Sequence, residues 1–245
     1  MMRLDKLLAH TGFGTRKEVK KIIRDKYVSV NGEVVRNAGE KVDPDKDDVR
    51  ISGQRIYYEE FVYFMLNKPA GVISATEDYV HDTVIDLLEP ADSVQEPHPV
   101  GRLDKDTEGL LLLTNDGKLT HQLTSPKKEV DKTYYAFVSG RVDQEDIEKF
   151  KEGILLKEDD EDYLTLSADL EILEVDEEAE TSEVYVTIRE GKFHQVKRMF
   201  HAVDKEVLYL KRISMGDLAL DENLELGEYR RLTEEELAKI KKIVG

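Results

Sequence analysis

The chain has 245 residues, of which 40% are hydrophobic, so it can bury one or two hydrophobic cores. It has no cysteine, which excludes disulfide frameworks and cysteine-based zinc sites and fits the reducing cytoplasm in which we expect it to act. No apolar run reaches membrane-spanning length, and the first residues lack the apolar core of a signal peptide, so we expect neither membrane insertion nor export.

The net charge of −17 argues at first sight against nucleic-acid binding. Its distribution is uneven. Residues 1–36 hold nine Lys and Arg against four Asp and Glu, whereas residues 143–183 hold eighteen acids against three bases. We therefore expect the acidic segment to face away from a bound polyanion. The charge of the whole chain still predicts weak nonspecific RNA binding with a steep salt dependence.

The first helices are predicted within a small module that covers residues 1–58. The spacing of Leu4, Leu7 and Leu8 indicates a helix over residues 3–10. Thr15 followed three residues later by Glu18 is a capping box, and the helix that it begins is expected to end near residue 26. The basic residues here suit RNA phosphates, although a solvated charged face is the ordinary alternative: Arg3, Lys6, Arg16, Lys17, Lys20 and Arg24.

The rest of this module is predicted to be short strands. Residues 28–35 read as a hairpin around the turn Asn31-Gly32. A further strand is expected at residues 49–51, followed by a linker over residues 53–60.

Residues 59–245 are predicted to form a larger α+β domain on a mainly antiparallel sheet. A helix beginning at Asp82 or Thr83 is expected to end before Pro90, and Thr233 to Glu236 is a second capping box that opens a terminal helix. The other expected strands are residues 61–66, 110–113, 133–138, 163–173 and 183–188, and the other expected helices are residues 117–125, 143–153 and 193–203.

The most informative stretch is a polar loop between Gly101 and Gly109 that leads into the apolar run 110–113. That run is typical of a strand buried on both faces. The loop carries Asp104, which a rigid strand could hold at the mouth of a cleft. A solvated acidic turn is the alternative reading of the loop. A metal site with His98 would have too few ligands.

Four motifs together give the chain a resemblance to pseudouridine synthases. The loop reads Gly-Arg-Leu-Asp-x-x-Thr-x-Gly-Leu-Leu-Leu, which is similar to the sequence around the catalytic aspartate of that family. Tyr63-Phe-Met-Leu-Asn-Lys-Pro69, Lys132-Thr-Tyr134 and Glu190-Gly-Lys-Phe-His-Gln-Val-Lys-Arg-Met-Phe200 match in the same order. The spacing resembles the RsuA branch, which modifies bacterial ribosomal RNA, and residues 1–58 resemble its S4 RNA-binding module.

The resemblance implies a catalytic set of Asp104, Tyr134 and Lys197. Asp104 would be the nucleophile, Lys197 its ion-pair partner, and Tyr134 would pack against the target base. From the residues alone, Lys197 could instead extend to water and Tyr134 could be a core aromatic. Strand alternation points Tyr135 to the opposite face from Tyr134. Four residues near these are implied RNA contacts, with local salt bridges or stabilisation of a helix start as alternatives: Arg102, His194, Gln195 and Arg198.

The implied reaction is the isomerisation of uridine to pseudouridine, which requires no cofactor and no metal. The expected substrate is ribosomal RNA or a small-subunit assembly intermediate, most simply at a 16S site of the kind that RsuA modifies. No membrane and no obligate protein partner is expected, and the protein is expected to be a monomer. The alternatives are a synthase that acts on 23S RNA, a noncatalytic S4-type RNA-binding protein, and a hydrolase that pairs Asp104 with Asp106 or Glu108.

Overall fold

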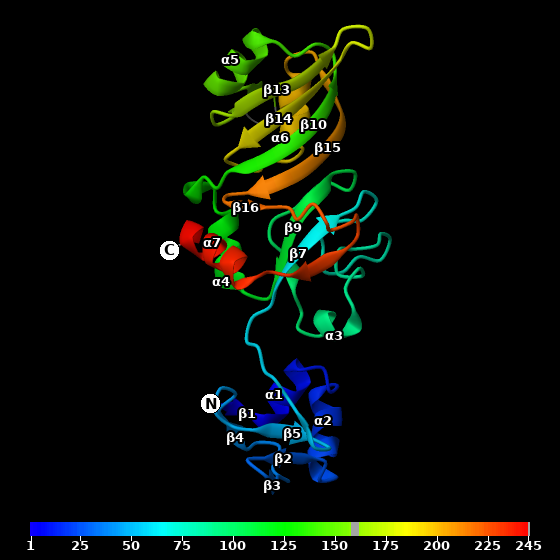
Figure 1. Ribbon diagram of the computed structural model, residues 1–245, viewed down its shortest axis with the longest axis vertical. Coiled ribbons are helices and arrows are strands. Elements are labelled where there is room, and N and C mark those ends of the chain that lie inside the picture. Colours follow the sequence, from blue (N-terminus) through cyan, green and yellow to red (C-terminus); the bar gives the residue numbers. More distant parts are fainter. Residues whose placement is uncertain (158–161, 245) are drawn as a thin grey trace. The chain divides into compact units, whose positions relative to one another are not determined.

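The computed structural model describes residues 1–157 and 162–244, and their contacts group into two compact units (Figure 1). The first unit contains Met1–Val62 and Leu88–Pro97, and the second contains Tyr63–Leu87 and His98–Gly245. The first unit thus includes a segment from the middle of the chain, with the short helix α3 (Pro90–Ser93), that the boundary predicted after residue 58 leaves out. None of the helices within the described ranges is long and apolar enough to cross a membrane.

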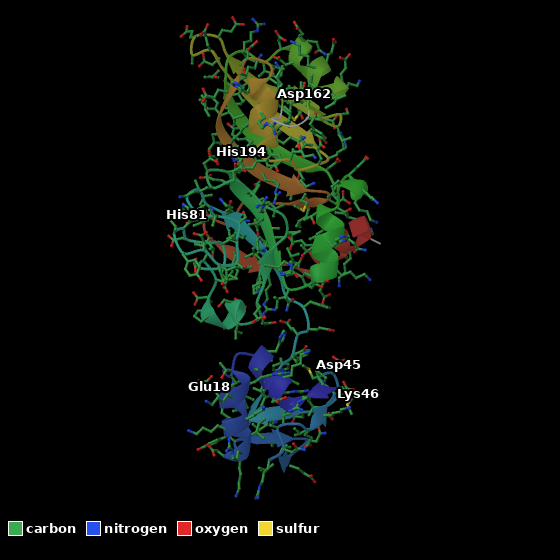
Figure 2. The ribbon with its side chains drawn as sticks, turned by 180° about the vertical axis from the view of Figure 1, so that it is seen from behind. Glu18, Asp45, Lys46, His81, Asp162 and His194 are labelled. Carbon is green, nitrogen blue, oxygen red and sulfur yellow. The ribbon has the colours of Figure 1, made fainter. Side chains whose placement is uncertain are left out.

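The first unit begins with the two predicted helices, α1 (Leu4–His10) and α2 (Arg16–Arg24). The capping box is confirmed, because the Glu18 carboxylate accepts the Thr15 backbone N–H at 2.7 Å and the Glu18 backbone N–H donates to the Thr15 hydroxyl at 3.4 Å. Glu18 is labelled on α2 in Figure 2. The core between the helices and strands is aliphatic and includes Leu4, Leu7, Leu8, Val19, Ile23 and Val28.

Two small sheets complete this unit. β1 (Met2–Arg3) pairs with β4 (Lys41–Val42), and a second sheet has the order β3-β2-β5-β6. The predicted hairpin is confirmed, with Asn31 and Gly32 at φ 52° and 87° between β2 (Val28–Val30) and β3 (Glu33–Val34). The predicted strand is confirmed as β5 (Val49–Ile51). The predicted linker is wrong at its beginning, since β6 (Gln54–Arg55) pairs with β5 across a turn at Ser52 and Gly53.

The second unit is built on one large sheet with the strand order β13-β14-β10-β15-β9-β7-β17. The pairs are antiparallel except for β15 with β9, so the expectation of a mainly antiparallel α+β domain is confirmed. The strands on this path are β7 (Tyr63–Lys68), β9 (Glu108–Thr114), β10 (Lys132–Ser139), β13 (Asp169–Asp176), β14 (Thr181–Ile188), β15 (Glu206–Met215) and β17 (Tyr229–Arg231). Two short strands extend it, β8 (His98–Pro99) beside β9 and β16 (Leu218–Ala219) beside β15.

Two helices cover one face of the β13-β14-β10-β15 end of this sheet (Figure 1). α5 (Gln144–Glu152) packs on β13 and α6 (Gln195–His201) packs on β15, and their Phe150 and Phe200 rings meet at 5.0 Å. The opposite face carries a cluster of tyrosine rings, in which the ring centroids of Tyr135 and Tyr209 are 6.0 Å apart. At the other end of the sheet, α4 (Gly117–Thr124) packs against α7 (Glu234–Val244), and the short 3-10 turn η1 (Pro126–Lys128) follows α4.

Two sequence-based expectations for this unit are wrong, and one strand was not expected. No helix forms over residues 83–88, because Thr83 bonds to the Asp86 carboxylate while the Val84 N–H donates to the Ile73 carbonyl oxygen, which ties the segment to an earlier part of the chain. The strand expected at 163–173 is divided into β12 (Tyr163–Leu164), which pairs with β11 (Leu155–Leu156), and β13. The long central strand β15 was not anticipated at all. Within the acidic segment, residues 158–161 lie outside the described residues.

The parallel contact between β9 and β15 depends on a glycine. Gly109 has φ 100°, and a Cβ atom there would lie 2.2 Å from the Arg212 carbonyl oxygen. Only glycine permits this approach of the two backbones together with a positive φ. The close pairing fixes the beginning of β9, and therefore also the loop that precedes it.

Candidate active site

The loop that carries Asp104 is held by hydrogen bonds on both sides. The Ser74 hydroxyl donates to the Leu103 carbonyl oxygen and accepts the Leu103 N–H, each at 3.0 Å. The Thr107 N–H donates to the Asp104 carbonyl oxygen at 3.1 Å, which closes a turn. The Asp104 side chain is 26% exposed and points from this braced loop into a pocket.

Beneath the loop lies Lys68, whose role was missed in the sequence. Lys68 is 0% exposed, and its ammonium donates to the carbonyl oxygens of Thr107, Pro69 and Asp104 at 2.9, 3.0 and 3.1 Å. Burial lowers the pKa of Lys68 to about 8, against the opposing effect of nearby carboxylates such as Asp106. The Lys68 ammonium therefore stabilises the backbone conformation of the loop by binding several of its carbonyl oxygens. A lone lysine at the end of an apolar strand was the available signal, because a buried cation needs several partners.

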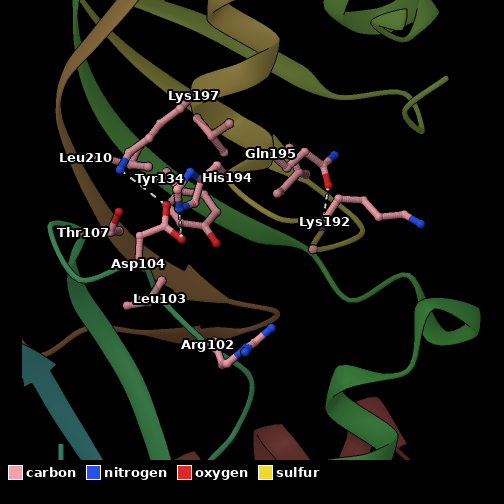
Figure 3. Close-up of a pocket in the computed structure, with 13 residues that line it drawn as sticks. Arg102, Leu103, Asp104, Thr107, Tyr134, Lys192, His194, Gln195, Lys197 and Leu210 are labelled. Carbon is pink, nitrogen blue, oxygen red and sulfur yellow. Dashed lines mark hydrogen bonds and ion pairs between the residues drawn. The ribbon is translucent and has the colours of Figure 1, made fainter. Parts of the chain in front are cut away.

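Lys197 on α6 also reaches the loop that carries Asp104 (Figure 3). Its ammonium lies 3.4 Å from Asp104 Oδ2 and 2.6 Å from Asp106 Oδ1. Lys197 lowers the pKa of Asp106, mainly through this hydrogen bond. The sequence suggested Asp104 as the partner of Lys197. The structure shows a shared ammonium, with the closer contact to the more exposed Asp106.

Two further side chains line the pocket with Asp104. His194 precedes α6 in a left-handed conformation, φ 49°, and its Nε2 lies 3.6 Å from Asp104 Oδ1. Tyr134 on β10 is 7% exposed and lines the same pocket. Tyr135 packs on the opposite face with Tyr185 and Tyr209, as strand alternation predicts. Figure 3 shows Asp104, Tyr134, His194 and Lys197 pointing toward one another.

The pocket opens into a wider cleft of about 550 Å³, a size that is typical of ligand sites. Arg102 is exposed and lines both the pocket and the cleft. The cleft is rich in cations and is lined, among others, by Arg102, Lys105, Lys132, Arg189, Lys192 and Arg212. Sequence reasoning missed Lys132, Arg189, Lys192 and Arg212 as components of the site.

Two predicted RNA-binding residues make internal contacts. Gln195 is buried, donates to the Glu190 carboxylate at 2.8 Å and accepts the Lys192 N–H at 2.9 Å. These bonds favour the alternative that Gln195 stabilises the start of the helix. Arg198 donates to the Lys157 carbonyl oxygen at 2.9 Å, which braces the segment after α5.

The basic residues predicted in the S4-like module belong to the first unit and are not part of this pocket. Arg3 donates twice to the buried Asp5 carboxylate, at 2.9 and 3.0 Å, which ties its guanidinium to the module. The other five are exposed: Lys6, Arg16, Lys17, Lys20 and Arg24.

Comparison with known proteins agrees with this geometry. The family model of RNA pseudouridylate synthase matches residues 62–202, and that of the S4 domain matches residues 2–49. The chain is 51% identical over 236 residues to a Bacillus subtilis protein named an uncharacterized RNA pseudouridine synthase, covering 96% of this chain and 97% of the relative.

Relatives with named ribosomal substrates are similar over almost their full length. Identity is 42% to ribosomal small subunit pseudouridine synthase A of Vibrio vulnificus, covering 98% of this chain and 99% of the relative. It is 41% to ribosomal large subunit pseudouridine synthase B of Bacillus subtilis, covering 98% and 96%. A crystal structure described as a pseudouridylate synthase shares 39% identity at a TM-score of 0.67, covering 98% of this chain and 100% of that one. The chain therefore belongs to the RNA pseudouridylate synthase family and is an isomerase that converts uridine to pseudouridine in RNA.

Proposed function

We propose that this enzyme isomerises one uridine of 16S ribosomal RNA, either in free RNA or in an assembling small subunit. The observation that carries its chemistry is the meeting of Asp104, Lys197 and Tyr134 in one pocket beside a cationic cleft. The choice of 16S RNA rests on the near-full-length similarity to several enzymes named ribosomal small subunit pseudouridine synthase A, at 40–43% identity.

The reaction breaks the bond between uracil N1 and ribose C1′, turns the base, and joins C5 to C1′. The C5 proton leaves to solvent and N1 gains a proton, so the change is an isomerisation and consumes no oxidant or water. A uridine must first leave the base stack to reach the pocket. The carboxylate of Asp104 acts as the nucleophile, either on the ring or at C1′, and this covalent step divides one difficult bond exchange into two easier ones.

The neighbouring side chains fit supporting roles. The Lys197 ammonium supplies a counter-charge and orients the Asp104 carboxylate from 3.4 Å. Tyr134 offers its ring as a surface for the uracil and its hydroxyl for proton transfer near C5, since it is almost buried in the pocket wall. Arg102 and His194 line the pocket mouth, where they would contact the flipped nucleotide.

A synthase for 23S RNA is the second candidate, and a specific observation favours it. The identity to ribosomal large subunit pseudouridine synthase B of Bacillus subtilis, 41%, is almost the same as that to the small-subunit enzymes. Both candidates share the same pocket and differ only in the RNA that they bind.

Pseudouridine mapping on ribosomal RNA from a deletion strain distinguishes the two candidates. The proposal expects loss of one pseudouridine from 16S RNA, which returns with the wild-type protein but not with Asp104→Asn. Loss of a 23S site instead would overturn the 16S assignment. Tritium release from 5-tritiated 16S transcripts and from purified small subunits, compared with 23S transcripts, would then show which form of the RNA is the substrate.

A further inference from the structure

Three side chains on one face of the large sheet line the cleft beside the Asp104 pocket: Lys132, Tyr134 and Arg212. Lys132 and Tyr134 alternate along β10 and therefore point to the same side of the sheet. Arg212 on β15 is the register partner of Tyr134. All three line the same cleft as Asp104. A nucleotide whose base stacks on Tyr134 would therefore place its sugar and phosphates near Lys132 and Arg212.

Arg212 has an unused donor at this floor. The residue is 2% exposed, and its Nε donates to the Leu110 carbonyl oxygen at 2.8 Å. Its Nη2 is buried and has no hydrogen-bond partner among the residues that the structure describes. An unmade hydrogen bond of a buried charged group is costly, so a guanidinium nitrogen left in this way at a cleft indicates a ligand.

Lys132 adds a second cation to the same place. Its ammonium donates to the Val130 carbonyl oxygen at 2.9 Å, which uses one of its three protons. Burial, followed by the charge of Arg212, lowers the pKa of Lys132 to about 8, while Asp131 and Glu190 act in the opposite direction. The two positive charges therefore repel each other, and an anion bound between them would reduce that repulsion.

The nearby carboxylates are engaged elsewhere. Asp131 accepts from Arg189 at 3.0 Å. Glu190 accepts from the Leu166 N–H and from Gln195, each at 2.8 Å, and from the Tyr163 hydroxyl. Among the described residues neither carboxylate makes a hydrogen bond with Arg212 Nη2, so this donor can take an anion from outside the protein.

We propose that Arg212 and Lys132 form a subsite for a backbone phosphate of the RNA next to the target uridine. This rests on the proposed function. A guanidinium and an ammonium offer donors only, which suits the nonbridging oxygens of a phosphate. The uracil edge has an N–H between its two carbonyl groups, and these two side chains have no acceptor for it. The subsite holds the strand so that the nucleotide enters the Asp104 pocket in a fixed orientation.

The test combines a charge removed from the protein with a charge removed from the RNA. A short RNA that contains the target uridine is made with single methylphosphonates on either side of that uridine, and its Kd and single-turnover rate are measured. In the wild type, one methylphosphonate should lower affinity about tenfold, the effect of losing a charge-assisted contact. In Lys132→Met the same substitution should cost less, about threefold, because one of the two cationic partners of the phosphate is already absent while Arg212 remains.

The controls separate this contact from general electrostatics and from misfolding. Lys211→Met removes a charge from the adjacent residue of β15, which faces the other side of the sheet, and should leave the methylphosphonate effect unchanged. Lys132→Arg should restore the effect, and Arg212→Lys should reduce it. A methylphosphonate several nucleotides away should cost the wild type and Lys132→Met the same.

Three results would overturn the proposal. One is an equal loss for wild type and Lys132→Met at every position next to the uridine. Another is competition by millimolar inorganic phosphate without any such position dependence, which would assign the subsite to a free anion. A third is a Lys211→Met effect as large as that of Lys132→Met. Wild-type protein that binds the RNA but releases no tritium from any ribosomal transcript or small-subunit particle would refute the proposed function instead, while the Kd series would still measure the subsite.

Discussion

Asp104 and Lys197 come from a loop and a helix that are distant in sequence, and their charged groups lie 3.4 Å apart at one pocket. Neither group is deeply buried, with side-chain exposures of 26% and 25%. The Lys197 ammonium is held on its other side by Asp106 at 2.6 Å. The two acids of this loop therefore differ both in exposure and in their distance from the Lys197 ammonium.

Asp104→Asn should abolish pseudouridine formation, because an amide of almost the same shape cannot act as the carboxylate nucleophile. Folding and RNA affinity should be retained. Single-turnover tritium release measures the reaction, and a filter-binding assay measures affinity. Asp106→Asn is the matched control, since it neutralises the neighbouring acid and should lower the rate less than about tenfold. Near wild-type turnover by Asp104→Asn would refute the assignment of the nucleophile.

Lys197→Met should slow the single-turnover rate by about a hundredfold, the size of a lost interaction of roughly 3 kcal/mol in the transition state, with Kd for RNA changed little. The loss also leaves Asp104 and Asp106 without their shared counter-charge. Adding Asp106→Asn to Lys197→Met should therefore recover part of the rate, and Lys197→Arg should retain most of it. If the double variant is slower than Lys197→Met alone, the ammonium does not act by compensating these two charges.

Replacing Arg16, Lys17 and Lys20 by Ala should weaken RNA binding and flatten its salt dependence. Each lost phosphate contact should reduce the slope of log affinity against log salt by about one. The rate at saturating RNA should stay within about tenfold of wild type, because the proposed catalytic residues around Asp104 belong to the other unit. The matched control replaces Lys149, Lys151 and Lys242, three exposed lysines of that unit. A larger fall in the saturated rate with unchanged binding would show that the S4 module also takes part in the chemistry.

Glu236→Gln should lower stability at neutral pH and have little effect in acid. Arg230 donates twice to the Glu236 carboxylate at 2.8 Å and lowers the pKa of Glu236 to about 2 from its ordinary value of 4.5. The unfolded chain therefore binds this proton first as pH falls, so the stabilisation is complete above pH 4.5 and disappears toward pH 2. After allowance for solvent screening, its size is about 1–2 kcal/mol.

Urea unfolding of wild type and Glu236→Gln at pH 7, 5 and 3 measures this contribution. The difference between the two proteins should shrink steadily from pH 5 to pH 3. Glu235→Gln is the control, because that carboxylate is 82% exposed and should show no comparable trend. A difference that is constant with pH would mean that Glu236 stabilises α7 by packing or capping and not through its charge.

Features whose hydrogen bonds close within a few residues could be predicted from the amino-acid sequence alone. The capping boxes at Thr15 and Thr233 are present, since each needs only one turn of helix. The hairpin at Asn31 and Gly32 forms because that pair adopts the positive φ angles required by the turn. The buried strand β9 follows from its apolar run. The four motifs that gave the family resemblance also lie in short, continuous stretches, so the reaction could be predicted without knowledge of the fold.

Features that depend on partners far along the chain became evident only in the folded structure. Thr83 and Asp86 have a helix-start pattern, but the bond from Val84 to Ile73 takes the backbone elsewhere. From the sequence, Lys68 was interpreted as part of a turn. In the structure it is buried under the loop and donates to the carbonyl oxygens of Asp104 and Thr107. Arg212 lies in the missed strand β15, and the pairing of that strand with β9 and β10 is what buries its guanidinium beside Lys132. Such positions were out of reach because burial and long-range pairing, not local propensity, set the charge environment of a side chain.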